Sequence, residues 1–213
     1  MKILVCILIG YLIGTVNPSY WIARHRGVDI RKKGSGNAGA SNALIVFGKV
    51  VGVLCALLDI AKAFFVIWLT ELLFPAFPYA LVLTGSACIL GHIFPFYMGF
   101  RGGKGLACLG GMILKYDWRV FLVMLIGEFF VAVGTKYICF VPMTASVIFS
   151  VVYGVMRSDW IGAVILLAVS CVIIWKHREN IRRIREGKEA RFSMLWNRER
   201  EEDRLRDKYE GEI

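Results

Sequence analysis

The sequence is divided into apolar runs, most of them long enough to cross a lipid bilayer. The first covers residues 3–23, and later ones cover 50–74, 79–97, 118–134, 138–156 and 160–175. A transmembrane helix needs about 20 mostly apolar residues. In agreement, 57% of the residues are hydrophobic and the mean hydropathy is +0.61. The chain is therefore predicted to be all-α, a polytopic transmembrane helix bundle.

Basic residues predict the orientation of this bundle. The formal net charge is +10, and positive residues collect at the ends of the apolar runs and in the tail. Beside apolar runs, such charge indicates cytoplasmic loops and anionic lipid headgroups rather than nucleic acid. The N-terminus is then predicted to lie outside, with glycine-rich loops 29–42 and 99–105 both at the cytoplasmic face. The first run resembles a signal peptide but lacks a small-x-small cleavage site, so we expect a retained span.

The number of membrane crossings in the second half of the chain must be even if the basic tail is cytoplasmic. Three spans after loop 99–105 would leave the basic tail outside, so segment 106–116 must also cross, fully or in part. At 1.5 Å per residue it is too short for a bilayer roughly 30 Å thick. Either its flanking residues extend it, or the bilayer is thinner there. We predict about seven helical segments, with the N-terminus out and the C-terminus cytoplasmic.

Residues 1–187 are predicted to form the transmembrane domain, and 188–213 a charged cytoplasmic tail. The tail mixes Arg, Lys, Glu and Asp in a pattern typical of a solvated or membrane-surface helix. Neither glycine-rich loop has a counterpart in the second half, which disfavours a secondary transporter built from repeated halves.

Loop 29–42, DIRKKGSGNAGASN, has the composition of an anion-binding loop. Its glycines permit left-handed backbone, and successive backbone N–H groups in such a loop can form a nest for phosphate. The candidate phosphate-binding residues in this loop are Gly34, Ser35, Gly36, Asn37, Gly39, Ser41 and Asn42. The letters GSGNAG satisfy the dinucleotide fingerprint GxGxxG, but RKK stands where the fingerprint needs a buried strand. A flexible loop without a ligand is the alternative.

Loop 99–105, GFRGGKG, is the second candidate phosphate site. Arg101 and Lys104 supply charge, and Gly102, Gly103 and Gly105 leave the backbone accessible. An arginine suits bidentate contacts to phosphate, whereas a lysine acts as a point charge. The loop is not a Walker A motif, because Met98 occupies the earlier glycine position and Gly105 replaces the Ser or Thr.

Polar residues at span ends extend this candidate site. His177 and Asn180 share a helix face at i, i+3, where the last span ends. His92 lies near the inner end of its span, where it would either contact substrate or pack as a hydrogen-bonding residue. Asp59 and Lys62 are ionisable residues inside an apolar run and are expected to pair. Glu128 is similarly placed, without an evident partner.

The six cysteines do not indicate a metal site or a disulfide framework. Each lies alone in or beside an apolar run, and no CxxC pair is present. They are expected to be small buried hydrophobes.

Together these motifs resemble the bacterial membrane glycerol-3-phosphate acyltransferases that use acyl-phosphate. The resemblance extends from Gly10 to Phe192 and rests on DIRKKGSGNAGASN, the DxxK at Asp59, GHIFPFYMGFRGGKG, TKY and HRENIRRIREGKE. It implies a seven-helix protein of the bacterial cell membrane, with its active site facing the cytoplasm. The implied reaction moves a fatty acyl group from acyl-phosphate to the 1-hydroxyl of glycerol 3-phosphate, in phospholipid synthesis.

The resemblance also implies roles for individual residues. By position, the functional residues are Ser35, Lys104, His177 and Asn180. The two glycine loops and His92 would bind the phosphate groups of the substrates. Acyl-phosphate is an activated donor whose departing phosphate can accept the hydroxyl proton, so His177 is expected to orient the acceptor rather than serve as a required base. No cofactor, metal or thiolate is expected.

The chain departs from the family pattern at position 45. Ile45 stands where the family commonly has an arginine, and Lys49, one turn further on, is the candidate to compensate. Milder departures are Ser41 for threonine, Ala63 for glycine and Cys108 for threonine. A lost charge-assisted hydrogen bond costs roughly 1.5–3 kcal/mol. The alternative is therefore a weakly active or inactive paralogue that binds phospho-ligands or lipid in a regulatory or scaffold role.

Overall fold

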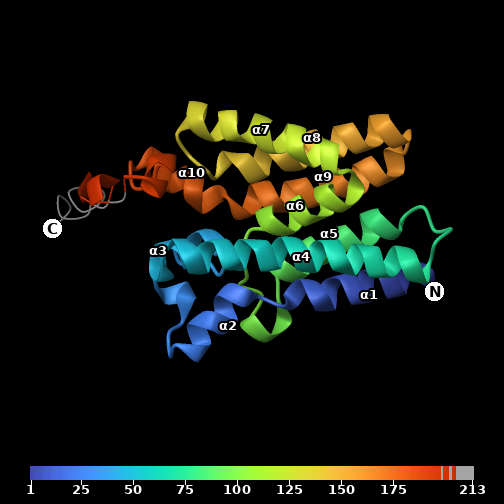
Figure 1. Ribbon diagram of the computed structural model, residues 1–213, viewed down its shortest axis with the longest axis horizontal. Coiled ribbons are helices and arrows are strands. Elements are labelled where there is room, and N and C mark those ends of the chain that lie inside the picture. The colour runs from blue at the N-terminus through green and yellow to red at the C-terminus, as the bar shows by residue number, and fades with distance from the viewer. Residues whose placement is uncertain (198, 202, 205–213) are drawn as a thin grey trace.

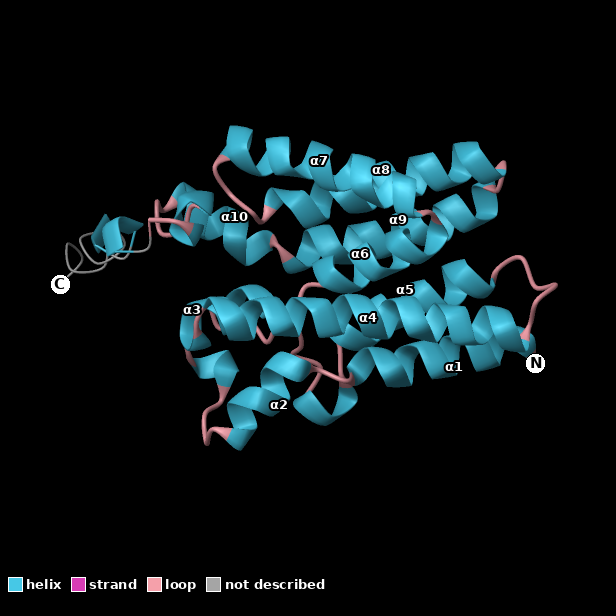
Figure 2. Cartoon of the chain, in the orientation of Figure 1, coloured by secondary structure: helices cyan, strands magenta, loops and turns pink. Residues whose placement is uncertain are grey.

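The computed structural model describes residues 1–197, 199–201 and 203–204, and in these residues all regular structure is helical (Figures 1 and 2). The α-helices are α1 (Lys2–Thr15), α2 (Pro18–His25), α3 (Ala40–Phe47), α4 (Lys49–Leu73), α5 (Ala80–Ile93), α6 (Leu106–Tyr116), α7 (Trp118–Thr135), α8 (Phe140–Arg157), α9 (Trp160–Lys176) and α10 (Arg178–Arg185). Short 3-10 helices are η1 (Ile30–Lys32), η2 (Phe96–Met98) and η3 (Phe192–Leu195).

The long helices form two groups, with α6 between them (Figure 1). Helices α1, α4 and α5 pack together on one side, and α7, α8 and α9 on the other. In the described part of the chain, 6 helical stretches are long and apolar enough to span a membrane. The prediction of a polytopic helix bundle is therefore confirmed.

The first predicted span is an integral part of this bundle. Asn17 and Pro18 break it into α1 and α2, because the Asn17 side chain accepts from the Tyr20 N–H as an N-cap and proline occupies the first helical turn. Helix α1 packs against α5 through its glycines. A Cβ at Gly10 would lie 3.1 Å from the Ala87 Cβ, so the two backbones approach closely.

The short helix α6 crosses most of the bundle because the chain before it turns back inward. After η2, Gly102 and Gly103 donate their N–H groups to the carbonyls of Ile93 and His92, each at 3.0 Å. The loop thus returns beside the last turn of α5 before α6 begins. At its other end, the Tyr116 ring packs at a tilt against Tyr153, near the far end of α8, with ring centroids 5.5 Å apart. Whether flanking residues or a thinner bilayer allows the short crossing stays a prediction.

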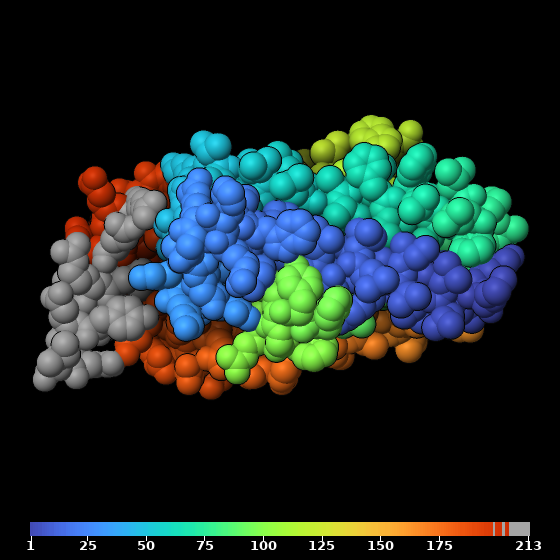
Figure 3. Space-filling model, turned by 90° about the horizontal axis from the view of Figure 1, so that it is seen from below, coloured from blue at the N-terminus to red at the C-terminus, as the bar shows by residue number. Residues whose placement is uncertain are grey.

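Both glycine loops lie at the end of the bundle that carries α3 and α10 (Figure 1). Residues of both loops line a single cavity there. Their predicted location at one face is confirmed, whereas the side of the membrane stays a prediction. Seen from below, Figure 3 shows the segment around η2 lying on the N-terminal helices, where Tyr97 donates to the carbonyl of Thr15.

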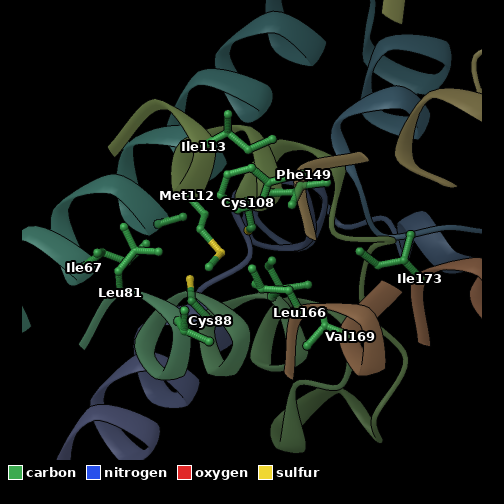
Figure 4. Close-up of a cluster of buried hydrophobic side chains, with 14 of the residues drawn as sticks. Ile67, Leu81, Cys88, Cys108, Met112, Ile113, Phe149, Leu166, Val169 and Ile173 are labelled. Atoms are coloured by element: carbon green, nitrogen blue, oxygen red, sulfur yellow. The ribbon is translucent and has the colours of Figure 1, made fainter. Parts of the chain in front are cut away.

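An apolar core joins the two helix groups (Figure 4). Its members come from α4, α5, α6, α8 and α9, and those labelled in the figure include Ile67, Cys88, Met112, Phe149, Leu166 and Ile173. By contrast, α7 buries only Glu128 and Ala132 and exposes large apolar residues along its length. Such an apolar outer face fits contact with lipid.

The structure accounts for Glu128, for which the sequence offered no partner. The Thr144 hydroxyl of α8 donates to Glu128 Oε2 at 2.7 Å, inside the bundle. Glu128 therefore forms a polar link between α7 and α8. Polar contacts between other helices include Thr70 with Thr84 at 2.9 Å and Ser150 with Ser170 at 3.3 Å.

The beginning of the charged tail differs from the solvated helix that its composition indicated. Residues 188–191 are non-helical and lead into η3, and Glu201 is buried. Arg204 donates to the carbonyls of Gly187 and Glu189 at 2.9 and 2.8 Å, which holds this segment against the bundle. The remaining part of that prediction, 205–213, lies outside the described residues.

Candidate functional site

A cavity of about 720 Å³ opens where the two glycine loops meet α10 and the tail. Its polar side is lined by Ser35, Lys104, His177, Asn180, Arg183 and Glu189. Its apolar side is lined by residues of α3, α4, α6 and α8, among them Leu44, Ala56, Leu106 and Pro142. The cavity thus places charged groups next to a lining suited to hydrocarbon.

Asn42 organises the first glycine loop from inside. Its side-chain amide donates to the carbonyls of Ile30, Lys33 and Asn37 at 2.8–3.0 Å, and its oxygen accepts the Ser35 N–H at 2.8 Å. The side chain is fully buried and does not line the cavity. Its polar atoms are used in shaping the loop rather than offered to a ligand.

Gly34 is required for this arrangement. Its φ of 57° is in the left-handed region, and a Cβ there would collide with the side-chain oxygen of Asn42. Ser35, the next residue, is consequently held at the cavity wall.

Arg31 connects the two glycine loops. It forms an ion pair with Asp29 at 3.0 Å and donates to the carbonyl of Met98 at 2.7 Å, just before the second loop. The hydrogen bond from Arg31 lowers the pKa of Asp29 below its ordinary value. Arg31 therefore aligns the loops and is not itself part of the cavity lining.

A buried charge network lies behind the second loop. Lys62 Nζ is 2.6 Å from Asp59 Oδ1, 2.5 Å from the carbonyl oxygen of Val16 and 3.0 Å from His92 Nδ1. His92 Nδ1 also lies 3.3 Å from Asp59 Oδ1, so the imidazole is held between the Lys62 ammonium and the Asp59 carboxylate. The predicted pairing of Asp59 with Lys62 is confirmed.

His92 Nε2 faces Gly103, where a Cβ would collide with the imidazole ring. Both Asp59 and His92 also reach the cavity. The network therefore presents one face to the second glycine loop. Asp59, His92 and Cys108 place possible ligand atoms within 4.8 Å of one another, and the Lys62 ammonium lies 2.6 Å from the Asp59 carboxylate.

Lys104 is directed into the cavity by Asn180. Its amine donates to the Asn180 side-chain oxygen, and the Asn180 amide donates in turn to Glu189 at 2.5 Å. Glu189 also accepts from Arg183 at 2.6 Å. Burial, and then the nearby positive charge of Arg183, lowers the pKa of Lys104 to about 8. The lysine is thus charged at neutral pH and close to its titration range.

His177 has its tautomer fixed by the backbone. Its Nδ1 lies 2.8 Å from the carbonyl oxygen of Ile173, which can only accept, so Nδ1 carries the proton and Nε2 has a lone pair. The residue is buried at the junction of α9 and α10 and lines the cavity with Asn180. Nε2 is the ring atom left to accept a hydrogen bond from a ligand.

The structure brings most of the predicted site residues together. Those at the cavity are Gly34, Ser35, Asn37, Gly39, Ser41, His92, Lys104, Gly105, His177 and Asn180. Those outside its lining are Gly36, Asn42, Arg101, Gly102 and Gly103. Arg101 is exposed. Gly102 and Gly103 shape the backbone against α5.

Four charged residues at the cavity had no assigned role from the sequence. They are Arg183, Lys188, Glu189 and Arg191. Arg183 continues the i, i+3 spacing of His177 and Asn180, so its helical face was available as a signal. Ile45 also lines the cavity, whereas Lys49 does not. Arg183, Lys188 and Arg191, rather than Lys49, are therefore the basic residues that line the same cavity as Ile45.

Comparison with known proteins identifies the family. Residues 4–187 match the family model described as glycerol-3-phosphate acyltransferase. A glycerol-3-phosphate acyltransferase of Lactiplantibacillus plantarum is 33% identical over 207 residues, covering 96% of this chain and 100% of the relative. One from Aquifex aeolicus is 34% identical over 195 residues, covering 90% of this chain and 100% of the relative.

Solved structures give the same result. The crystal structure of PlsY, an integral membrane glycerol 3-phosphate acyltransferase, in its glycerol 3-phosphate form has a TM-score of 0.82 at 32% identity. The match covers 92% of this chain and 98% of the PlsY chain. The lysophosphatidic acid form has a TM-score of 0.79 at 31% identity, covering 92% and 97%. The chain therefore belongs to the glycerol-3-phosphate acyltransferase family of integral membrane enzymes.

Proposed function

We propose that this enzyme transfers a fatty acyl group from acyl-phosphate to the 1-hydroxyl of glycerol 3-phosphate. The observation that carries the proposal is a single cavity with Lys104, His177 and Asn180 on one side and apolar side chains of α3, α4, α6 and α8 on the other. A polar phosphate and a long hydrocarbon chain need these two environments next to each other. The names of the relatives support glycerol 3-phosphate as the acceptor.

The reaction exchanges one bond to the acyl carbon for another. The acceptor hydroxyl oxygen attacks the acyl carbonyl carbon, and the bond from that carbon to the phosphate oxygen breaks. The products are lysophosphatidate and inorganic phosphate, which takes up the hydroxyl proton. Because the leaving phosphate provides the base, catalysis depends mainly on positioning and on stabilising charge.

The cavity residues fit these requirements. The Lys104 ammonium would neutralise phosphate charge as it develops, with Asn180 holding it in place. Ser35 and the first glycine loop would bind phosphate oxygens beside it. His177, with a lone pair on Nε2, would accept a hydrogen bond from the acceptor hydroxyl and orient it.

His92 supports the second loop and reaches the same cavity. Its Nδ1 is held by Lys62 and Asp59, which leaves Nε2 as the ring nitrogen that would contact a phosphate held between the loops. Lys62 and Asp59 would keep the ring in this orientation. We assign His92 to substrate binding on this ground, and Asp59 and Lys62 to its support.

Other basic residues at the cavity would supply the phosphate-binding charge that Ile45 lacks. Although Ile45 lies at the wall, Lys104, Arg183, Lys188 and Arg191 provide positive groups at the same cavity. The positive loops and tail also support a cytoplasmic location for this end, in a bacterial cell membrane.

Phosphate release from palmitoyl-phosphate tests the proposal. Purified protein in detergent should release phosphate only when glycerol 3-phosphate is also present, and Lys104→Ala should reduce the rate by about 100-fold or more. Lys49→Ala, which removes a lysine outside the cavity, is the matched control and should retain the wild-type rate. Transfer of the palmitoyl group from a thioester but not from palmitoyl-phosphate would refute acyl-phosphate as the donor.

A further inference from the structure

A second groove lies beside the active-site cavity, between α7 and the tail. It has a volume of about 750 Å³ and is lined by Phe129, Ala132, Val133, Lys136, Arg191, Phe192, Ser193, Trp196, Asn197, Arg200, Glu201 and Arg204. We infer that this tail groove binds the phosphate headgroup and upper chain of an anionic phospholipid from the surrounding bilayer. The site differs from the cavity in which acyl transfer is proposed.

The tail groove is built from two elements held together by defined contacts. The Phe192 N–H donates to the carbonyl of Lys136 at 2.8 Å, which attaches the tail to the end of α7. Arg204 then links the helical residues after η3 to the carbonyls of Gly187 and Glu189. The charged tail is therefore folded as one wall of a site.

One side of the groove is apolar and aromatic. Phe192 packs edge-on against Phe129 and Trp196, with ring centroids 6.0 and 5.1 Å apart. Trp196 is nevertheless 64% exposed and Phe129 54% exposed. Because α7 presents apolar side chains to lipid, these rings lie where a bilayer surface would meet the protein. Aromatic residues favour this interfacial position.

The other side of the groove is positively charged. Four basic residues line it against one acidic residue, Glu201. Burial raises the pKa of Glu201, but hydrogen bonds from Arg204 and the Arg191 N–H bring it below its ordinary value. Arg204 pairs with Glu201, and the described lining contains three further basic residues, Lys136, Arg191 and Arg200. Such clusters beside a membrane recognise anionic headgroups.

An aromatic side next to a basic side favours binding of a phospholipid over binding of a soluble anion. Cationic and aromatic groups occur together at the end of a transmembrane helix, and a phospholipid presents both matching parts from the bilayer. Arg191 and Phe192 also line the active-site cavity, so a lipid in the groove would rest on its wall. This inference does not depend on the acyl donor, because it concerns binding alone.

Native mass spectrometry of delipidated protein in neutral detergent tests the inference. Phosphatidylglycerol should bind more tightly than phosphatidylcholine, and Lys136→Gln with Arg200→Gln should weaken that binding about tenfold. The matched control is Arg182→Gln with Arg185→Gln, which removes the same charge from exposed positions on α10. The control should bind phosphatidylglycerol as the wild type does.

Further variants and a competition measurement identify the binding site and the ligand. Lys104→Ala should leave phosphatidylglycerol binding unchanged, which separates the groove from the active site. Trp196→Ala, at an exposed side chain, should weaken binding without loss of folding. Equal affinity for both lipids, equal losses in the test and control pairs, or full competition by millimolar inorganic phosphate would overturn the inference.

Discussion

The amine of Lys104 donates a hydrogen bond to the side-chain oxygen of Asn180, 76 positions later in the chain. This contact joins the second glycine loop to α10 across the cavity. It also fixes which end of the Asn180 amide faces the loop, because the other end donates to Glu189. Three side chains, those of Lys104, Asn180 and Glu189, thus form a hydrogen-bonded chain at the wall of the cavity.

The pH dependence of activity should follow Lys104. Its pKa is lowered to about 8, so the free enzyme loses this positive charge as the pH rises through that value. We expect kcat/KM for glycerol 3-phosphate to fall above pH 8, since this parameter reports ionisations of free enzyme and substrate. The dependence of kcat/KM on pH is measured from initial rates of phosphate release between about pH 6.5 and 9.5. A profile that stays flat to pH 9.5 would exclude Lys104 as a phosphate-binding cation.

Glu189→Ala should impair catalysis by releasing Asn180. Without this carboxylate, the Asn180 amide can rotate and the Lys104 amine loses its fixed direction. We expect kcat/KM to drop about tenfold, and Glu189→Gln to recover part of it because the amide oxygen still accepts from Asn180. Glu186→Ala, an exposed residue on the preceding turn, is the control. Equal rates for Glu189→Ala and wild type would contradict the positioning role.

Asn42→Ala should destabilise the protein although Asn42 does not reach the cavity. The change leaves the Asn37 carbonyl and the Ser35 N–H without their partner, whereas the Ile30 and Lys33 carbonyls still accept from backbone N–H groups. A buried unsatisfied polar group costs about 1–3 kcal/mol. We expect a clear fall in Tm together with loss of activity. Ser41→Ala, an exposed neighbour, should keep the wild-type Tm. A normal Tm with abolished activity would instead indicate direct substrate contact by Asn42.

Gly103→Ala should disrupt the second loop. The new methyl group would overlap the His92 ring, so either the loop or the Lys62–Asp59 network must shift. We expect at least a tenfold loss of kcat, since small misplacements of catalytic groups are costly. Gly134→Ala in α7, where the space around the added methyl is open, is the matched control. Similar rates for both variants would show that the loop tolerates a side chain here.

Ile45→Arg tests the departure from the family pattern. Because Ile45 lines the cavity near other basic residues, an arginine there should lower KM for glycerol 3-phosphate about tenfold or less. Val46→Arg, on the same helix but outside the cavity lining, controls for added charge. A gain of several hundredfold in activity would mean that the natural chain is a decayed enzyme.

The sequence was sufficient to predict that two distant glycine loops meet, because the number of crossings determines which ends lie together. The i, i+3 spacing likewise placed His177 beside Asn180. Asn42 shows the limit of this reasoning. An asparagine in a glycine-rich loop can bind a ligand or satisfy the loop's own backbone, and only the direction of its side chain distinguishes the two.

The tail shows a second limit. Alternating acidic and basic residues are typical of a solvated helix, yet Glu189 and Arg183 pair with each other beside Asn180. Composition cannot reveal such contacts, because they depend on where the preceding helix delivers the chain. The same holds for Glu128, whose partner Thr144 lies on the next helix.

The inward return of the chain between α5 and α6 has a consequence for where the two substrates meet. Since Gly102 and Gly103 pair with the last turn of α5, Lys104 is held beside that turn, inside the bundle end that carries α3 and α10. The lipid-soluble donor would then keep its hydrocarbon immersed while its head reacts, and the water-soluble acceptor would descend to it. The enzyme would therefore catalyse the reaction at the membrane–water interface, without extracting its lipid substrate from the membrane.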